Sequence, residues 1–159
     1  RHRWPDDSAA HAYDAAQIAS DTRTALITAR RPFIAETVFS HPSKLDIIDQ
    51  AHAAGFTVFL HVMLVPEELA VSRVRYRVHA GGHTVPEDKI RARYQRLWPF
   101  VVTAMSRADV ATVYDNSGIA GPQIVAQLAI GAPVGVVQWP PWTPEPQPAD
   151  VLSAIATPS

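Results

Sequence analysis

Apolar residues along this chain follow two spacings, one typical of helices and one typical of buried strands. Apolar side chains three and four residues apart predict amphipathic helices over residues 8–30, 43–54, 67–80 and 86–107. Short continuous runs rich in β-branched residues predict buried strands over residues 33–38, 56–65 and 110–114. Ser8 suits the N-cap of the first helix and Gly55 the C-cap of the second. Pro99 predicts a break in the last helix, with a second short helix after it.

The order of these elements predicts the fold class, which is α/β. Helices that alternate with strands apolar on both faces indicate a parallel sheet in a three-layer α/β/α arrangement. Ligands of such sheets bind at the carboxyl ends of the strands. Two further apolar runs, residues 123–129 and 134–138, predict a β-hairpin after the sheet. Proline then accumulates and predicts an extended tail.

Length, charge and residue types narrow the possible functions. With 159 residues the chain is long enough for one domain with its own core. A net charge of −1 does not indicate nucleic-acid binding, and no apolar run reaches the length of a membrane span. The absence of cysteine excludes disulfides and thiolate metal sites, and we expect a cytoplasmic location. His79 and His83 have zinc-pair spacing, but two intervening glycines would break the helix, so we expect no metal site.

Half of the basic side chains lie in one segment, which reads RVRYRVHAGGHTVPEDKIRARYQR. Arg73 and Arg77 are four residues apart and therefore share one helix face. Beyond a Gly-Gly turn that can act as a hinge, Lys89, Arg93 and Arg96 repeat this one-face spacing. Guanidinium groups make two-point contacts with phosphoryl oxygens, so the segment is typical of a lid that binds phosphate. The alternative is a solvated helical hairpin with its arginines in water.

A group of polar residues follows the first predicted strand, and it consists of Glu36, Thr37, Ser40, His41 and Lys44. A carboxylate at a strand end can orient a substrate hydroxyl or hold a Mg²⁺-bound water, and the hydroxyl side chains can bond a substrate. Glutamate in an apolar strand is costly unless it is used or paired. Two alternatives stay open: Glu36 pairs with an arginine as a structural ion pair, and residues 40–43 cap the next helix.

Three segments of the chain match the motifs of a known family. They read AETVFSHPSKLDIIDQAHAAGFTVFLHVML, RVRYRVHAGGHTVPEDKIRARYQR and VYDNSG, and they span residues 36–118. The pairing of E-T-x-F-S with R-V-x-x-G-G-H-x-V-P-x-x-x-I-x-x-R-Y is specific, and the chain thereby resembles the zeta toxin family of P-loop kinases. This resemblance implies a P-loop kinase-like fold with ATP and Mg²⁺ as cofactors. It also implies phosphorylation of the nucleotide sugar UDP-N-acetylglucosamine at its 3′-hydroxyl, and a small antitoxin protein that blocks the site.

The resemblance implies roles on the phosphate side for four residues. Arg77 and Arg93 match the lid arginines that clamp phosphate, so both are expected to be catalytic and to bind ATP. Asn116 matches the loop near the adenine. Arg91 is a weaker match among the expected cofactor-binding residues.

On the acceptor side, the resemblance implies that Glu36 and Thr37 bind substrate, with Glu36 also acting in catalysis. Ser40 belongs to the same strand motif and is expected to bind substrate. Arg73 is a weaker match that we also place with the substrate-binding residues.

One departure from the family pattern is large. No stretch of the 159 residues matches G-x-x-x-x-G-K-[ST], and none supplies the acidic base that follows the next strand in the family. We expect both to precede Arg1, so that the first strand and the P-loop are missing, the chain alone is inactive, and the sheet has a gap or an exposed apolar edge. The expected parts are a kinase core without its P-loop, its lid, a hairpin extension and a tail, at residues 1–118, 66–107, 119–142 and 143–159.

Two alternative functions follow from this departure. The chain can be a catalytically dead remnant that binds a nucleotide sugar or a protein partner. It can instead belong to a P-loop kinase that phosphorylates an antibiotic or another small metabolite.

Overall fold

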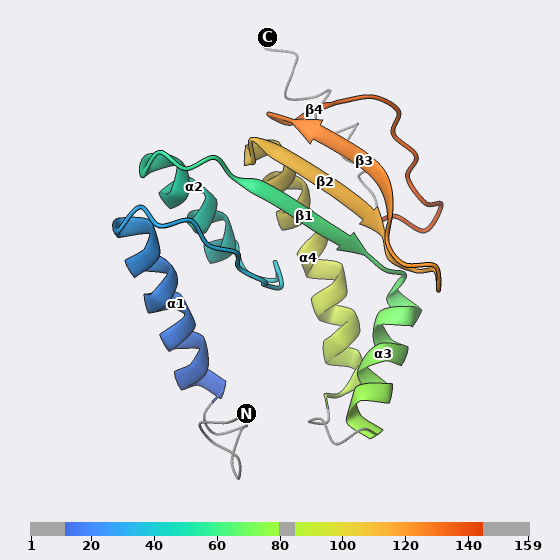
Figure 1. Ribbon diagram of the computed structural model, residues 1–159. Coiled ribbons are helices and arrows are strands. Elements are labelled where there is room, and N and C mark those ends of the chain that lie inside the picture. The colour runs from blue at the N-terminus through green and yellow to red at the C-terminus, as the bar shows by residue number, and fades with distance from the viewer. Residues whose placement is uncertain (1–11, 80–84, 145–159) are drawn as a thin grey trace.

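The computed structural model describes residues 12–79 and 85–144, which form a mixed α/β fold (Figure 1). The described residues contain one four-stranded sheet in the order β1-β2-β3-β4. Its strands are β1 (Phe59–Leu64), β2 (Val110–Asp115), β3 (Gln123–Ala129) and β4 (Ala132–Pro133). β1 and β2 run parallel, whereas β3 is antiparallel to both of its neighbours. The strands predicted at residues 56–65 and 110–114, and their parallel pairing, are confirmed.

The helices also agree with the helical spacing of the sequence. They are α1 (Ala12–Thr28), the short 3-10 helix η1 (Pro42–Lys44), α2 (Leu45–Ala53), α3 (Glu67–His79) and α4 (Glu87–Arg107). Gly55 follows α2 with a φ of 82°, a backbone conformation that glycine adopts at little cost. The predicted helix start at Ser8 and the Gly-Gly turn lie outside the described residues. No helix in the described ranges is long and apolar enough to cross a membrane.

The strand predicted at residues 33–38 was wrong. The chain between α1 and η1 is extended but contains no strand, and Ile34 is fully exposed within it. A buried strand needs a hydrogen-bonded neighbour, and among the described strands β1 pairs only with β2 and leaves its other edge without a strand partner. An apolar run shows that a segment can be buried, but the run does not supply the strand that must lie beside it.

The predicted break at Pro99 was also wrong, because α4 continues through this proline to Arg107. Proline cannot donate the backbone hydrogen bond that this position normally makes, which costs about 3 kcal/mol in a helix interior. Pro99 itself is exposed, but Trp98, Val101 and Val102 beside it are buried in the core. Burial of these three side chains offsets the cost of the proline and holds α4 as one helix.

The core lies on one face of the sheet. Leu64, Val113 and Leu128 point from the strands toward Trp98 and Met105 of α4, and all five are buried in one cluster. α2 packs beside α4 on the same face through a smaller cluster.

The opposite face of the sheet lacks a helical layer within the described residues. Phe59, Met63 and Ile124 point to that face and are 64%, 51% and 58% exposed. The third layer of the predicted α/β/α arrangement is therefore not formed by the described residues. Among the described strands β1 is an edge strand and carries two of these side chains, while a missing first strand beside it stays a prediction.

The hairpin after β2 is confirmed, although its second strand is shorter and earlier than predicted. β4 contains only two residues, but pairing continues through bonds of 2.8 Å from Val134 N to Gln127 O and from Gln138 N to Val125 O. The turn between β3 and β4 has positive φ at both Ile130 and Gly131. β3 pairs directly with β2, so the hairpin extends the main sheet.

Candidate phosphate-binding lid

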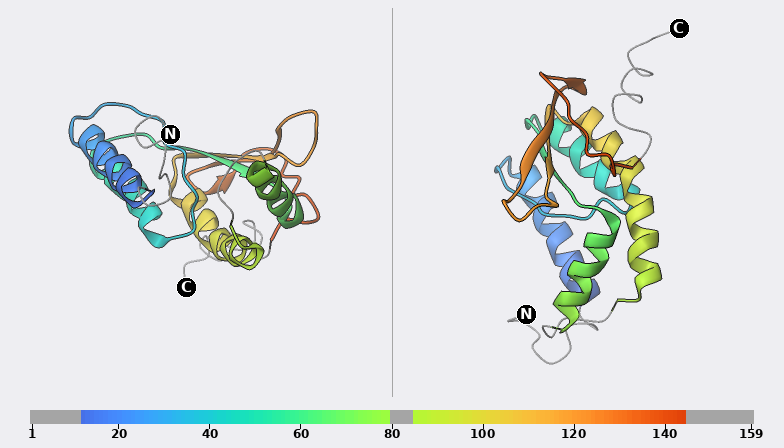
Figure 2. Two further views of the ribbon diagram at one scale, coloured as in Figure 1. Left: turned by 90° about the horizontal axis from the view of Figure 1, so that it is seen from below. Right: turned by 90° about the vertical axis from the view of Figure 1, so that its right-hand side faces the viewer.

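Helices α3 and α4 form an antiparallel hairpin, which we call the lid (Figures 1 and 2). α3 begins at Glu67, shortly after β1 ends at Leu64, so the lid projects from the carboxyl ends of β1 and β2. Ligand sites of parallel sheets lie at this edge. The start of α3 therefore lies at this edge, and the binding of phosphate by the lid arginines stays a prediction.

Arg73 joins the lid to the loop after β2. Its Nη2 donates a hydrogen bond of 2.8 Å to the backbone oxygen of Asn116. The backbone N–H of Asn116 donates in turn to Leu64 O at 2.8 Å. The loop is held further by Asp115, whose Oδ1 accepts a bond from Ser117 N. The structure thus brings together Arg73 and Asn116, which the sequence assigned separately to the substrate and the cofactor.

Arg91 joins the two lid helices. Its guanidinium group meets Glu68 with two bonds, from Nη1 to Oε1 at 2.5 Å and from Nη2 to Oε2 at 3.0 Å. It also donates to Glu87 Oε1 from Nε at 3.0 Å and from Nη2 at 2.8 Å, and to Glu67 Oε1 at 3.1 Å. Arg75 adds a further ion pair with Glu87. We call these five residues the Arg91 cluster. The predicted contact between Arg91 and ATP stays a prediction.

The charges in the Arg91 cluster shift the pKa values of its members. Hydrogen bonds from Arg91 lower the pKa of Glu68 below its usual value, and bonds from Arg91 and then Arg75 lower the pKa of Glu87. The carboxylates raise the pKa of Arg91 in return, with Glu68 as the largest cause. All three groups are thus held in their charged forms.

Arg77 and Arg93 differ from the arginines of the cluster. Both are exposed, and neither forms a hydrogen bond or ion pair with another residue of the described ranges. Each lies two residues beyond a cluster arginine, which is about 200° around a helix, so each lies on a different side of its helix from that arginine. Their guanidinium groups are open to a ligand. Their convergence on one ligand near Glu36 stays a prediction.

The predicted acceptor-side residues lie in the extended segment before η1. Glu36 and Thr37 are exposed and Ser40 is half-buried. Within the part of the chain that the structure describes, Glu36 has no ion pair, so the alternative of a structural pair with an arginine finds no support there. The helix-cap alternative is confirmed by His41, whose Nδ1 accepts a bond of 3.2 Å from Ser43 N.

Sequence reasoning missed the residues that hold the lid in place. Tyr94 donates a hydrogen bond of 2.8 Å from its hydroxyl to Val65 O, which ties α4 to the end of β1. Burial, and then the charge of Glu67, raise the pKa of this hydroxyl. The spacing of Glu87 and Arg91, four residues apart on one helix, is a signal that could have revealed part of the cluster. No local signal links Arg91 to Glu67 and Glu68, which belong to the other helix.

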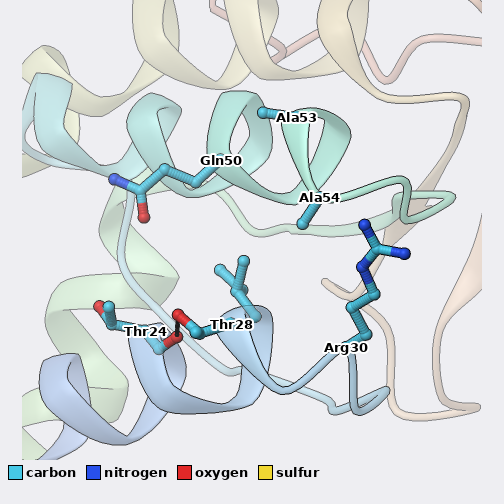
Figure 3. Close-up of a pocket in the computed structure, with 7 residues that line it drawn as sticks. Thr24, Thr28, Arg30, Gln50, Ala53 and Ala54 are labelled. Carbon is cyan, nitrogen blue, oxygen red and sulfur yellow. Dashed lines mark hydrogen bonds between the residues drawn. The ribbon is translucent and has the colours of Figure 1, made fainter.

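A separate cavity of about 420 Å³ lies between α1 and α2 (Figure 3). Thr24, Thr28 and Arg30 line it from the α1 side, and Gln50 lines it from α2. None of the predicted site residues lines this cavity. Among the described residues, no group of three His, Asp or Glu side chains could hold a metal ion.

The sequence model of the Zeta toxin family matches residues 3–121, about three quarters of the chain. The chain belongs to the zeta toxin family. Neither the comparison with curated proteins nor the comparison with solved structures gave a match. Membership of the zeta toxin family indicates a P-loop kinase-like function, that is, phosphotransfer with nucleotide binding in the general sense. Proteins of this family generally use ATP and Mg²⁺.

The residues of this zeta toxin family member fit only part of an ATP site. The exposed guanidinium groups of Arg77 and Arg93 suit phosphoryl oxygens. The 159-residue sequence contains no glycine-rich phosphate loop, and the described residues contain no group of three His, Asp or Glu side chains that could hold a metal ion.

Proposed function

We propose that this chain forms the lid and the acceptor side of an ATP-dependent kinase that phosphorylates a hydroxyl of a nucleotide sugar similar to UDP-N-acetylglucosamine. The observation that carries the proposal is the division of the lid arginines. Arg75 and Arg91 are neutralised by glutamates, whereas Arg77 and Arg93 have no carboxylate partner among the described residues. Arginines left open on a lid that projects from the carboxyl ends of parallel strands can neutralise charge on a transferred phosphoryl group.

The acceptor hydroxyl would meet the segment before η1. Glu36 is an exposed carboxylate without an ion pair in the described ranges, so it is free to accept a hydrogen bond from a substrate hydroxyl. The hydroxyls of Thr37 and Ser40 follow within four residues and can bind other polar groups of a sugar. An antitoxin that covers this segment and the lid would block both substrates at once.

The 159 residues by themselves should not transfer phosphate. Without a glycine-rich loop, no set of backbone N–H groups surrounds the β-phosphate and no lysine reaches the γ-phosphate. The lid arginines stabilise a transition state only after ATP has been positioned, so they cannot replace this loop. The reaction requires a phosphate loop that these 159 residues do not contain.

Radiolabelled ATP incubated with UDP-N-acetylglucosamine tests the proposal. We expect no transfer by the 159-residue chain and clear transfer by a chain extended upstream in its coding sequence to include a phosphate loop. Transfer by the 159-residue chain would overturn the argument from the missing loop. Transfer by the extended chain to an aminoglycoside or another metabolite, but not to the nucleotide sugar, would show that the proposed acceptor is wrong and that the kinase acts on a different substrate.

A binding role without turnover is the second candidate, because these 159 residues contain no glycine-rich phosphate loop. In that case the lid and the acceptor side still bind the nucleotide sugar. Isothermal titration of UDP-N-acetylglucosamine into the 159-residue chain distinguishes the cases, because binding combined with an inactive extended chain supports a remnant that binds without catalysis.

A further inference from the structure

The lid helices are joined by charged contacts as well as by apolar packing. Val71 is the buried residue of α3, and the buried residues of α4 begin only at Trp98. The first eleven residues of α4 therefore lie beside α3 without a buried side chain of their own. Apolar residues of this half, such as Ile90 and Leu97, are only half-buried, so apolar packing fixes the distance and rotation between the helices less firmly here than at Trp98.

The Arg91 cluster lies in this half of the lid. Glu67 and Glu68 belong to the first turn of α3, and Glu87 belongs to the first turn of α4. Arg91 bridges all three, and Gln95 adds a bond of 2.8 Å from its Nε2 to Glu67. One guanidinium group thus connects two positions on one helix with one position on the other.

We propose that Arg91 is a positioning residue, which fixes α3 relative to α4 and so sets the distance between the phosphate-binding arginines Arg77 and Arg93. The phosphate role of those two arginines rests on the proposed function. The placement of the helices by Arg91 rests on the contacts alone.

The chemistry of the side chain favours arginine for this role. A guanidinium group carries five N–H donors in a planar fork, and Arg91 directs them to three carboxylates at once. An ammonium group is a point charge that cannot hold two carboxylates in fixed planes. Lysine at this position should therefore keep the attraction between the helices and lose much of the fixed geometry.

The cluster also predicts that Arg91 and Arg77 act differently toward an anion. A phosphate that approaches Arg91 must displace carboxylates that already satisfy its donors, whereas Arg77 has no such competitor among the described residues. Arg91 then affects phosphate transfer through the placement of Arg77 and Arg93.

Spin labels on the two lid helices test the proposal directly. The chain contains no cysteine, so Ser72→Cys on α3 and Ala92→Cys on α4 give two specific labels at exposed positions. Double electron–electron resonance spectroscopy then measures the distribution of distances between the two labelled helices. We expect a narrow distribution with Arg91, a broader one with Arg91→Lys and the broadest with Arg91→Gln. Arg96→Gln is the matched control, because it removes an equal charge from the same helix outside the cluster, and it should leave the distribution unchanged.

Salt and a second variant complete the test. Raising the salt concentration from about 0.05 M to about 1 M should broaden the distribution of the Arg91 chain, because exposed ion pairs are screened, and should change Arg91→Gln little. Glu68→Gln removes only one carboxylate and should broaden the distribution even if Arg91→Gln fails to fold by circular dichroism. A distribution that stays narrow in both variants would overturn the proposal.

Kinetics separate this inference from the proposed function. In the extended kinase, Arg91→Gln should lower kcat by about tenfold or more with little change in KM for ATP, because misplaced arginines lose contacts made in the transition state. Arg91→Lys should recover part of this loss. If the extended chain transfers no phosphate to any acceptor, the proposed function fails, and the distance distributions still decide whether Arg91 positions the lid.

Discussion

At the scale of single residues, the lid arginines differ in their partners. Arg75 and Arg91 are held by glutamates of the two lid helices, and Arg73 is held by a backbone carbonyl. Arg77 and Arg93 are exposed and meet no other described residue through a hydrogen bond or ion pair. The residues best suited to meet a phosphate are therefore those that contribute least to the folded structure.

This difference leads to a prediction for the extended kinase. Arg77→Ala and Arg93→Ala should each lower kcat by about two to three orders of magnitude, the loss seen when one charge-stabilising donor is removed. Neither change should alter the free energy of unfolding by more than about 0.5 kcal/mol, because both side chains are exposed. Phosphotransfer assays and urea unfolding measure the two effects.

Arg107→Ala is the control for this pair of variants. Arg107 lies at the opposite end of α4 and forms an exposed ion pair of 2.6 Å with Asp49. We expect kcat to be unchanged in this variant. Equal losses of kcat in all three variants would show that positive charge in general, and not the position of Arg77 and Arg93, affects the reaction.

At the scale of elements, Asp109 connects three segments that are distant in sequence. Its Oδ2 accepts a bond of 2.7 Å from Val58 N, just before β1, and contacts His52 Nε2 of α2 at 2.9 Å. Asp109 itself directly precedes β2. The Val58 N–H, and then His52, lower the pKa of the carboxyl below its usual value of 3.8.

Asp109→Asn should therefore destabilise the fold in a pH-dependent way. At pH 7 we expect a loss of about 1 kcal/mol in the free energy of unfolding, because one charge-assisted bond is weakened at a partly exposed site. Because the pKa of this carboxyl is lower in the folded state, the carboxylate stabilises the fold fully at pH values above its pKa in the unfolded state. The difference between the two proteins should shrink as the pH falls below 3.8 and through the lower folded pKa. Urea unfolding at several pH values measures it.

Asp49→Asn is the matched control for this prediction. Asp49 pairs with Arg107 at the surface, with 54% of its side chain exposed, so its loss should cost about 0.5 kcal/mol or less. An equal cost for both variants at pH 7 would contradict a special role of Asp109 at the junction of α2, β1 and β2.

At the scale of the whole molecule, the described residues pack on one face of the sheet only. Met63 and Leu64 are neighbours in β1, but Met63 is 51% exposed and Leu64 is 6% exposed. Adjacent strand residues point to opposite faces of a sheet, so the exposed fractions of these two side chains show that one face is covered and the other is open among the described residues.

This arrangement predicts unequal effects of two substitutions in the 159-residue chain. Leu64→Ala should lower the free energy of unfolding by about 2–4 kcal/mol, because it leaves a cavity in the core. Met63→Thr should change it by less than about 1 kcal/mol, because threonine also favours strands and little buried surface is lost. Urea unfolding of both variants tests the prediction, and a large loss with Met63→Thr would show that another layer covers the exposed face.

The sequence by itself determined the local elements of this protein and its family. Four helices and the two parallel strands follow from apolar spacing, which depends on residues close together in the chain. The spacing of the lid arginines likewise placed Arg73 and Arg77 on one helix face. Motifs of fixed spacing also pointed to the zeta toxin family, which the family match then confirmed.

Only the tertiary structure decided which of these residues have partners. Whether residues 33–38 form a strand depends on the presence of a neighbouring strand. Whether α4 continues as one helix through Pro99 depends on the burial of Trp98 beside it. Arg91 donates a hydrogen bond to Glu68 on the other lid helix, 23 residues earlier in the chain. Asp109 accepts one from the backbone N–H of Val58, which is 51 residues away in sequence. Contacts over such distances leave no periodic signal in the sequence, because they are set by how the elements pack in space.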